Sequence, residues 1–157
     1  MDDNFSPKVK DVIAYSKEEA LRLGHDFIGT EHLVLGLLRK GDGKAIQILN
    51  TLEINLEHLR KKIEILSPVN PSGVTANEKR NLHLTKQSEK ALKTTFLEAK
   101  LYKSESVNTA HLLLCILRNE NDPTTKLLHK FDVDYEEVKA LFKELFLETK
   151  IFSRGLS

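Results

Sequence analysis

Three residues of this chain are of types that could bind a charged ligand: Ser6, Thr85 and Glu31. Ser6 and Thr85 each precede an apolar pattern of helical spacing, so each is expected to open a helix, and the free N–H groups at a helix start attract anions. Glu31 follows Thr30 and is expected in the first turn of another helix. The residues alone favour the simpler interpretation, in which Ser6 and Thr85 cap their helices and Glu31 complements a helix dipole.

Other kinds of chemistry lack the residue spacing that they need. The stretch GLLRKGDGK, residues 36–44, fails as a phosphate-binding loop because Asp42 stands where lysine is required. His32 and His111 occupy equivalent positions, but no His-x-x-x-His or Cys-x-x-Cys pattern exists, so we expect partly buried structural imidazoles. The order of serine, histidine and acidic residues does not match a catalytic triad, so no nucleophile is assigned. We therefore expect no catalytic residue, no metal and no cofactor, and the chain is not predicted to be an enzyme.

The composition indicates a soluble protein of a reducing compartment. The chain has 157 residues, and 24 basic against 23 acidic side chains leave a formal charge of +1. That balance lacks the basic excess that nucleic-acid binding requires. The single cysteine, Cys115, lies in an apolar run and is expected to be a buried, unreactive thiol. Without a signal-peptide pattern or a membrane-length apolar run, the sequence predicts a cytoplasmic protein that binds neither nucleic acid nor membrane.

The sequence also repeats itself. Residues 5–63 align without a gap on residues 84–142 when they are displaced by 79 positions. Within them, IGTEHLVLGLLR and VNTAHLLLCILR share six of twelve residues. An ungapped alignment of this length indicates a duplicated unit, and two copies favour a pseudo-symmetric globule over an open solenoid. The second copy has Ala110 where the first has Glu31.

Each unit is predicted to contain four helices, about eight in all, in an all-α fold. Apolar residues recur at helical spacing in both units, and no alternating run of β-branched residues predicts a strand. The predicted helix starts are marked by capping residues, which are Ser6, Thr30 and Asn55 in the first unit and Thr85, Thr109, Asp122 and Asp134 in the second.

The composition changes between the units and after the second one. We predict a single domain over residues 1–148, made of repeat one at 5–66, a connector at 67–83 and repeat two at 84–148. The connector is rich in Pro, Gly, Ser and Asn and is expected to be exposed and of low order. Residues 149–157 lose the apolar period and are predicted to form a tail or the start of a linker.

Two long stretches carry a resemblance to a known family. The first is FSPKVKDVIAYSKEEALRLGHDFIGTEHLVLGLLRKGDGKAIQIL at residues 5–49, and the second is LTKQSEKALKTTFLEAKLYKSESVNTAHLLLCILR at residues 84–118. In this order they resemble the N-terminal repeat domain of Clp-type AAA+ unfoldases, and they are most similar to the ClpC branch. The resemblance implies a small domain of two four-helix repeats, mounted on a hexameric ATPase ring that works with a peptidase.

The resemblance also implies a ligand. In ClpC relatives this domain binds phosphoarginine, a degradation mark in some bacteria. A glutamate binds the guanidinium, and the threonine that opens the first helix helps to hold the phosphate; Ser6 stands at that position here and keeps the hydroxyl. Carried over, the first site pairs Ser6 with Glu31 and the second pairs Thr85 with Ala110. Because a methyl group cannot accept a hydrogen bond, we expect one functional site rather than two.

The function expected from the resemblance is non-catalytic recognition. The chain is expected to bind protein substrates and adaptor proteins for an ATP-dependent Clp unfoldase, and to be a monomer in isolation. The alternative is a free-standing adaptor or accessory subunit of the Clp machine with the same fold. A reading frame that continues into an ATPase module distinguishes the first function from the second.

Overall fold

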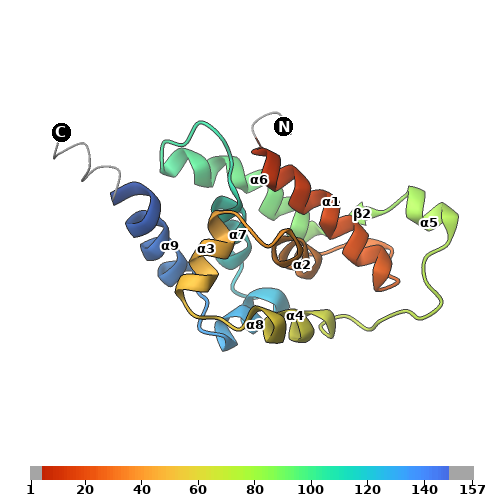
Figure 1. The fold of residues 1–157 in the computed structure, drawn as a ribbon. Helices are drawn as coiled ribbons and strands as arrows, with labels where there is room; N and C mark the ends of the chain where they lie inside the picture. The colour runs from red at the N-terminus through yellow and green to blue at the C-terminus, as the bar shows by residue number, and fades with distance from the viewer. Residues whose placement is uncertain (1–4, 149–157) are drawn as a thin grey trace.

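The computed structural model describes residues 5–148, so the predicted tail at 149–157 lies outside the described part. Within these residues the protein is all-α, as predicted, apart from two strands of two residues each, β1 (Phe27–Ile28) and β2 (His83–Leu84). The helices are α1 (Pro7–Arg22), α2 (Thr30–Lys40), α3 (Lys44–Thr51), α4 (Leu56–Glu64), α5 (Ala76–Arg80), α6 (Lys86–Leu101), α7 (Thr109–Arg118), α8 (Pro123–Lys130) and α9 (Tyr135–Phe142), followed by a π-helical segment at Lys143–Glu148 (Figure 1).

The helices confirm the duplication. Helices α1 to α4 form one unit and α6 to α9 form the other, and each helix of the second unit begins 79 residues after its counterpart in the first. The extra helix, α5, lies in the connector. Two copies of a four-helix unit therefore account for the described domain.

Most of the predicted helix caps are confirmed, but two are wrong. Ser6, Asn55, Thr85, Asp122 and Asp134 are N-caps whose side chains accept hydrogen bonds from the first turns of their helices. The N-cap of α2, in contrast, is Gly29 and that of α7 is Asn108, each one residue before the predicted threonine.

In α7 the side chain of Asn108 accepts the first-turn N–H groups of Ala110 and His111, whereas Gly29 of α2 has no side chain that could do so. A histidine supports both helix starts from within the first turn. The Nδ1 atoms of His32 and His111 accept hydrogen bonds from the backbone N–H groups of Gly29 and Asn108, at 2.8 and 3.0 Å. A side chain three residues into the helix thus satisfies the N-cap N–H, as the glutamate of a capping box does. Both histidines are fully buried rather than partly buried as predicted, and the bonds to Gly29 and Asn108 agree with the predicted structural role.

The units interlock through short pieces of parallel strand that the sequence did not predict. Strand β1 of repeat one pairs with β2, which leads into α6 of repeat two. In the equivalent place, Phe5 forms a parallel bridge with Val107. The first helix of each repeat therefore starts beside the start of the other repeat's second helix: α1 beside α7, and α6 beside α2.

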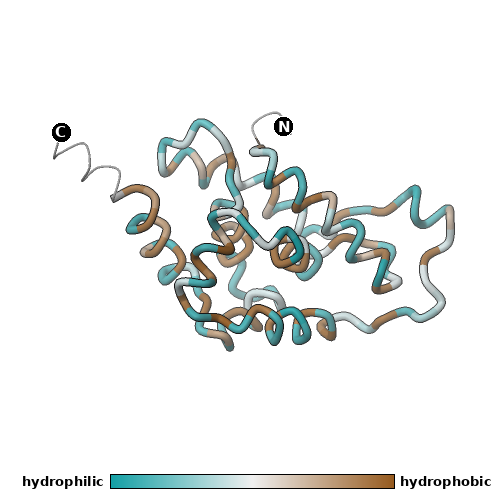
Figure 2. Tube along the Cα trace, in the orientation of Figure 1, coloured by the Kyte–Doolittle hydropathy of each residue, from teal (hydrophilic) through white to brown (hydrophobic). Residues whose placement is uncertain are grey.

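The core lies around α2 and α7, which pass through the middle of the molecule (Figures 1 and 2). Every residue of α7 from Thr109 to Leu117 is buried, as is every residue of α2 from His32 to Leu37. Apolar side chains from α3, α4, α8 and α9 complete one large cluster with them. Within residues 5–148, no helix combines the length and the apolar character that a membrane span requires.

The connector is more ordered than its composition suggests. Residues 76–80 form α5, because Thr75 and Glu78 make a reciprocal capping box. The connector's first residues are held against repeat one, where the N–H of Asn70 donates to the carbonyl of Leu23 at 3.0 Å. Helix α5 has no buried residue and stands away from the other helices in Figure 1, so the predicted exposure is correct for this part.

Candidate ligand-binding site

The start of α6 lies against repeat one. The N–H of Thr85 donates to the carbonyl of Ile28 at 3.0 Å, and the buried Oγ of Ser88 donates to the same carbonyl at 2.6 Å. The hydroxyl of Thr85 accepts the N–H of Ser88 at 3.2 Å, which is the expected cap. These bonds fix the N-terminal end of α6, with its partial positive charge, directly beside the loop that leads into α2.

Glu31 lies in the first turn of α2, on the other side of that loop. Its carboxylate folds back over Gly29, where a side-chain Cβ would collide with Oε1. The Oε2 atom accepts a hydrogen bond of 2.5 Å from the hydroxyl of Ser67, the first residue of the connector. Glycine at position 29 thus leaves room for the carboxylate, and the connector supplies its hydrogen-bond donor.

Glu31 and Thr85 line one small pocket of about 210 Å³. The pocket collects residues from both repeats and from the connector, which are Phe27, Thr30, Glu31, Leu66, Ser67, Thr85, Gln87, Asp122, Pro123 and Thr124. It places a carboxylate next to the N-terminal end of a helix. Such a pair suits a ligand that carries a cationic hydrogen-bond donor close to an anionic group.

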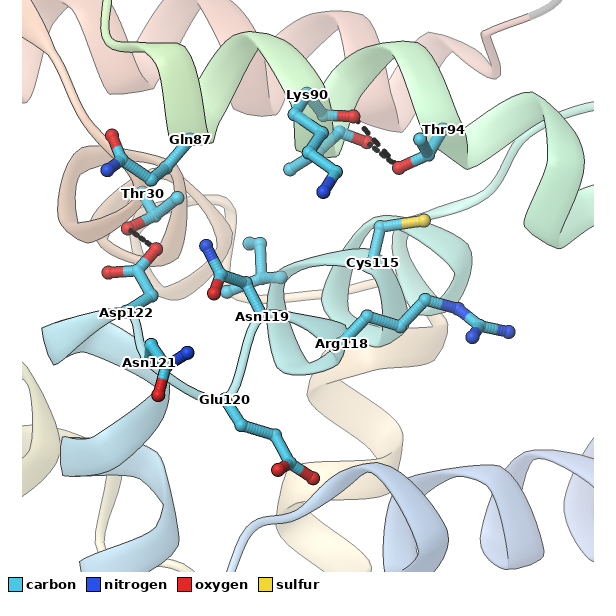
Figure 3. A pocket seen from close by; sticks show the side chains of 12 residues that line it. Thr30, Gln87, Lys90, Thr94, Cys115, Arg118, Asn119, Glu120, Asn121 and Asp122 are labelled. Atoms are coloured by element: carbon cyan, nitrogen blue, oxygen red, sulfur yellow. Dashed lines mark hydrogen bonds between the residues drawn. The ribbon is translucent and has the colours of Figure 1, made fainter.

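One wall of the pocket is held by a buried hydrogen-bond cluster between the repeats. The Oγ1 of Thr30 donates to Oδ2 of Asp122 at 2.8 Å (Figure 3). It also lies 2.9 Å from the hydroxyl of Thr124. The other oxygen of Asp122 caps α8 by accepting the N–H of Thr124. Because both oxygens of Asp122 are used within the protein, Glu31 is the carboxylate that a ligand can compete for.

A chain of imidazoles supports the same loop from behind. Since Nδ1 of His32 accepts from Gly29, its Nε2 carries the proton and donates to Nδ1 of His25 at 2.8 Å. Nε2 of His25 then donates to the carbonyl of Pro68 at 2.8 Å. This chain ties the start of α2 to the connector beside Ser67.

The imidazole chain requires neutral rings. Burial lowers the pKa of His32 to about 4, although the nearby charge of Glu31 acts in the opposite direction. A proton on either ring would place two N–H groups face to face. The positions of the loop and of Ser67 therefore depend on neutral histidines.

The predicted pairing of the site residues is wrong. Ser6 does not lie with Glu31: its N–H donates to the carbonyl of Val107 at 2.8 Å, which places it beside the start of α7 and hence beside Ala110. Thr85 takes the place beside Glu31. The physical reason is the strand pairing between the repeats, which places the start of α6 beside α2 and the start of α1 beside α7.

The structure adds residues that the sequence does not mark as part of the site. Asp122 was predicted as a helix cap, but nothing in the sequence placed it across from Thr30. Ser67 was included in a connector expected to be of low order, and its bond to Glu31 gives no signal in the sequence. Among the described residues, no group of three or more His, Cys, Asp or Glu side chains is arranged to hold a metal ion.

Comparison with known proteins identifies a family over most of the chain. The model of the Clp repeat (R) N-terminal domain matches residues 4–131. A probable ATP-dependent Clp protease ATP-binding subunit of Chlamydia pneumoniae is 33% identical over 99% of this chain. The ClpC/MecB protein of Bacillus subtilis, a negative regulator of genetic competence, is 32% identical over 86% of it. The matched regions are 18% and 16% of those two relatives, so the chain spans less than a fifth of their length.

A solved structure supports the same fold. The N-domain of ClpV from Vibrio cholerae superposes with a TM-score of 0.73, covering 90% of this chain and 84% of that one at 14% identity. At that identity the likeness concerns the fold alone.

Proposed function

Because the chain belongs to the Clp repeat (R) N-terminal domain family, we propose that it recognises protein substrates and adaptor proteins for an ATP-dependent Clp unfoldase, and that its Glu31–Thr85 pocket binds phosphoarginine. The substrate is the modified side chain on a protein, and no catalytic step is involved. The carboxylate of Glu31 binds the guanidinium, and the N-terminal end of α6 at Thr85 binds the phosphoryl group.

The observation that carries the proposal is that the two repeats bring a carboxylate and a helix start to one 210 Å³ pocket. Phosphoarginine has a guanidinium nitrogen bonded directly to phosphorus, so its cationic and anionic parts are a few ångströms apart. A carboxylate satisfies the guanidinium N–H groups, and the first-turn N–H groups of a helix satisfy phosphate oxygens. Phosphoserine has no group for Glu31, and arginine has none for the helix start.

Ligand binding has to replace one contact that exists in the structure. The hydroxyl of Ser67 donates to Oε2 of Glu31, which is the atom that a guanidinium would use. The exchange is favourable because a guanidinium donates through a charge and can engage both carboxylate oxygens, whereas the hydroxyl donates one neutral hydrogen bond.

Calorimetric titration with free phosphoarginine tests the proposal. The wild-type chain is expected to bind one equivalent. Glu31→Gln keeps the shape but removes the charge, so the affinity is expected to fall about ten- to a hundredfold, equivalent to a charge-assisted bond of about 1.5–3 kcal/mol. Thr85→Ala should weaken binding too, since it loosens the start of α6.

Matched controls make the result specific. Glu136→Gln removes another first-turn acid, that of α9, and Ser6→Ala removes the cap at the other helix start. Neither change should alter the affinity, and neither free arginine nor phosphoserine should bind measurably. A wild-type chain that fails to bind phosphoarginine, or a Glu31→Gln variant that binds equally well, contradicts the proposal.

A further inference from the structure

The two repeats differ in how closely their first two helices approach. In repeat one, Gly36 of α2 faces α1, and a Cβ there would lie 2.5 Å from the carbonyl oxygen of Val12 and would collide with the hydroxyl of Ser16. The equivalent residue of α7 is Cys115, whose side chain stands between α7 and α6 (Figure 3). A side chain at this position prevents α6 from lying as close to α7 as α1 lies to α2.

Repeat one also closes the gap between its helices with an ion pair that repeat two lacks. The ammonium of Lys40 lies 3.0 Å from the carboxylate of Asp11. The residues 79 positions later are Asn119 and Lys90, which cannot form that pair. No other described residue makes a hydrogen bond or ion pair with the ammonium of Lys90.

A second ion pair of repeat one is replaced by an exposed apolar surface. Arg39 pairs with Glu18 across the same helices at 3.4 Å. In repeat two, Arg118 corresponds to Arg39, but Leu97 corresponds to Glu18 and is 61% exposed. One helical turn further on, Leu101 is 64% exposed.

These differences leave a trough between α6 and α7, which extends from Lys90 to Leu101 and is named the α6–α7 groove. Its polar part is a pocket of about 490 Å³ that contains Lys90, and its apolar part is a second pocket of about 490 Å³ that contains Leu97 and Leu101. The two parts share Thr94 and Arg118 as lining residues. A single ligand could therefore reach both the cation and the leucines.

The groove is continuous with the Glu31–Thr85 pocket. Three residues, Thr30, Gln87 and Asp122, line both that pocket and the polar part of the groove. Figure 3 shows Lys90 extending from α6 toward α7 within this part, while Glu120 extends away from it. A chain that leaves the pocket along α6 therefore meets a cation that no described residue pairs with, and then two exposed leucines.

We propose that the α6–α7 groove binds the polypeptide segment that flanks a phosphoarginine, and that it selects an acidic residue followed by an apolar one. The inference rests on the proposed function and adds a sequence preference to it. The ammonium of Lys90 favours a carboxylate in the polar part, where Arg118 is already paired with Glu98, and the apolar end favours a side chain that covers Leu97 and Leu101. A protein segment is the occupant because it enters from the pocket as the backbone that carries the modified side chain.

The spacing of the preferred residues is set by the helix rise. From Thr85 to Lys90 the groove runs about 7.5 Å at 1.5 Å per residue, and from Lys90 to Leu97 about 10 Å. An extended peptide advances about 3.3 Å per residue. With the backbone of the phosphoarginine placed level with Thr85, the acidic residue is expected two positions from the phosphoarginine, and the apolar residue three positions beyond the acidic one.

The test uses synthetic phosphoarginine peptides and the intact chain. The matching peptide has Asp two positions and Leu five positions from the phosphoarginine, and it is made in both chain directions. The comparison peptides replace Asp by Lys or Leu by Ser. Calorimetry should show one direction of the matching peptide binding about tenfold tighter than free phosphoarginine. Each replacement should lower the affinity of that peptide by about fivefold or less.

Variants of the groove are expected to change the preference in a predictable sense. Lys90→Asp should reverse the choice between the Asp and Lys peptides. The double change Lys90→Asp with Asn119→Lys transplants the ion pair of repeat one and should reduce the ratio of peptide affinity to free-ligand affinity. Lys17→Glu, a charge reversal on the exposed face of α1, is the matched control and should leave the peptide preference as it is.

The outcomes separate this inference from the proposed function. If free phosphoarginine binds through Glu31 but the peptides bind no tighter, or if Lys90→Asp leaves the preference unchanged, the groove has no such role and the proposed function stands. If neither the free ligand nor any peptide binds, both are overturned. Circular dichroism melts of the variants establish that each is folded.

Discussion

Acidification from pH 7 to pH 5 is expected to destabilise the protein through two buried imidazoles. Burial lowers the pKa of His32 and of His111 to about 4 each, from an ordinary value of 6.5. Between these values the unfolded chain binds protons that the folded chain cannot bind. The free energy of unfolding therefore falls as the pH falls from 6.5 toward 4, and the full contribution is present only above 6.5.

The magnitude can be worked out from the two pKa values. At pH 5 an unfolded histidine is almost fully protonated, whereas one with a pKa near 4 is mostly neutral. The linkage relation then gives a loss of about 2 kcal/mol per imidazole between pH 7 and pH 5, or about 4 kcal/mol for the pair. That is a large part of the stability of a domain of this size.

Urea unfolding followed by circular dichroism at pH 7 and pH 5 measures this loss. His111→Gln removes one of the two titrating groups, while a glutamine at this position can still accept the N–H of Asn108, as in a capping box. The free energy of unfolding of the variant should fall by only about 2 kcal/mol over the same interval. Because both proteins contain the same carboxylates, the difference between them isolates the imidazole. Equal losses in the two proteins would refute the assignment of the pH dependence to the buried rings.

Three further perturbations test other parts of the structure. Ser67→Ala should tighten phosphoarginine binding about fivefold in calorimetry, because the ligand no longer displaces a hydroxyl worth about 1 kcal/mol; weaker binding would instead make Ser67 a ligand contact. Gly36→Ala should lower the free energy of unfolding by about 1–3 kcal/mol, because its Cβ would lie 2.5 Å from the carbonyl of Val12, and a raised melting temperature would contradict that packing. Limited digestion with a nonspecific protease should make its first internal cut at residues 71–75, between the anchored start of the connector and α5; mass spectrometry showing a first cut within residues 109–118 would contradict the fold.

The fold could be predicted from the sequence because its signals are local or repeated. Helix starts such as Asn55 and Asp134 are marked by a polar cap before an apolar pattern. Because the units are displaced by 79 residues, the pattern of each helix also occurs twice in the sequence. Where the prediction failed, a tertiary contact was responsible. Thr30 resembles a cap, but its hydroxyl bonds to Asp122, 92 residues away, while the N-cap is Gly29, whose N–H donates to His32.

The candidate site was predicted only in part, for the same reason. Glu31, Ser6 and Thr85 have recognisable local roles, so the sequence identifies them as candidates. Which of them meet depends on the pairing of β1 with β2, and strands of two residues carry no periodicity that a sequence can reveal. Helix α5 is different, because its capping box of Thr75 and Glu78 is a local signal, but the surrounding turn-forming residues favour a loop.

An NMR titration with free phosphoarginine tests whether the ligand site is built from both repeats. Two-dimensional ¹H–¹⁵N spectra of the labelled chain should show the amides of Glu31 and of Gln87, at the starts of α2 and α6, shifting along one saturable curve. The amides of Ser6 and Ala110, at the other pair of helix starts, should stay in place. Shifts at Ser6 without shifts at Gln87, or no saturable shift at either helix start, would contradict a ligand site shared by the two repeats.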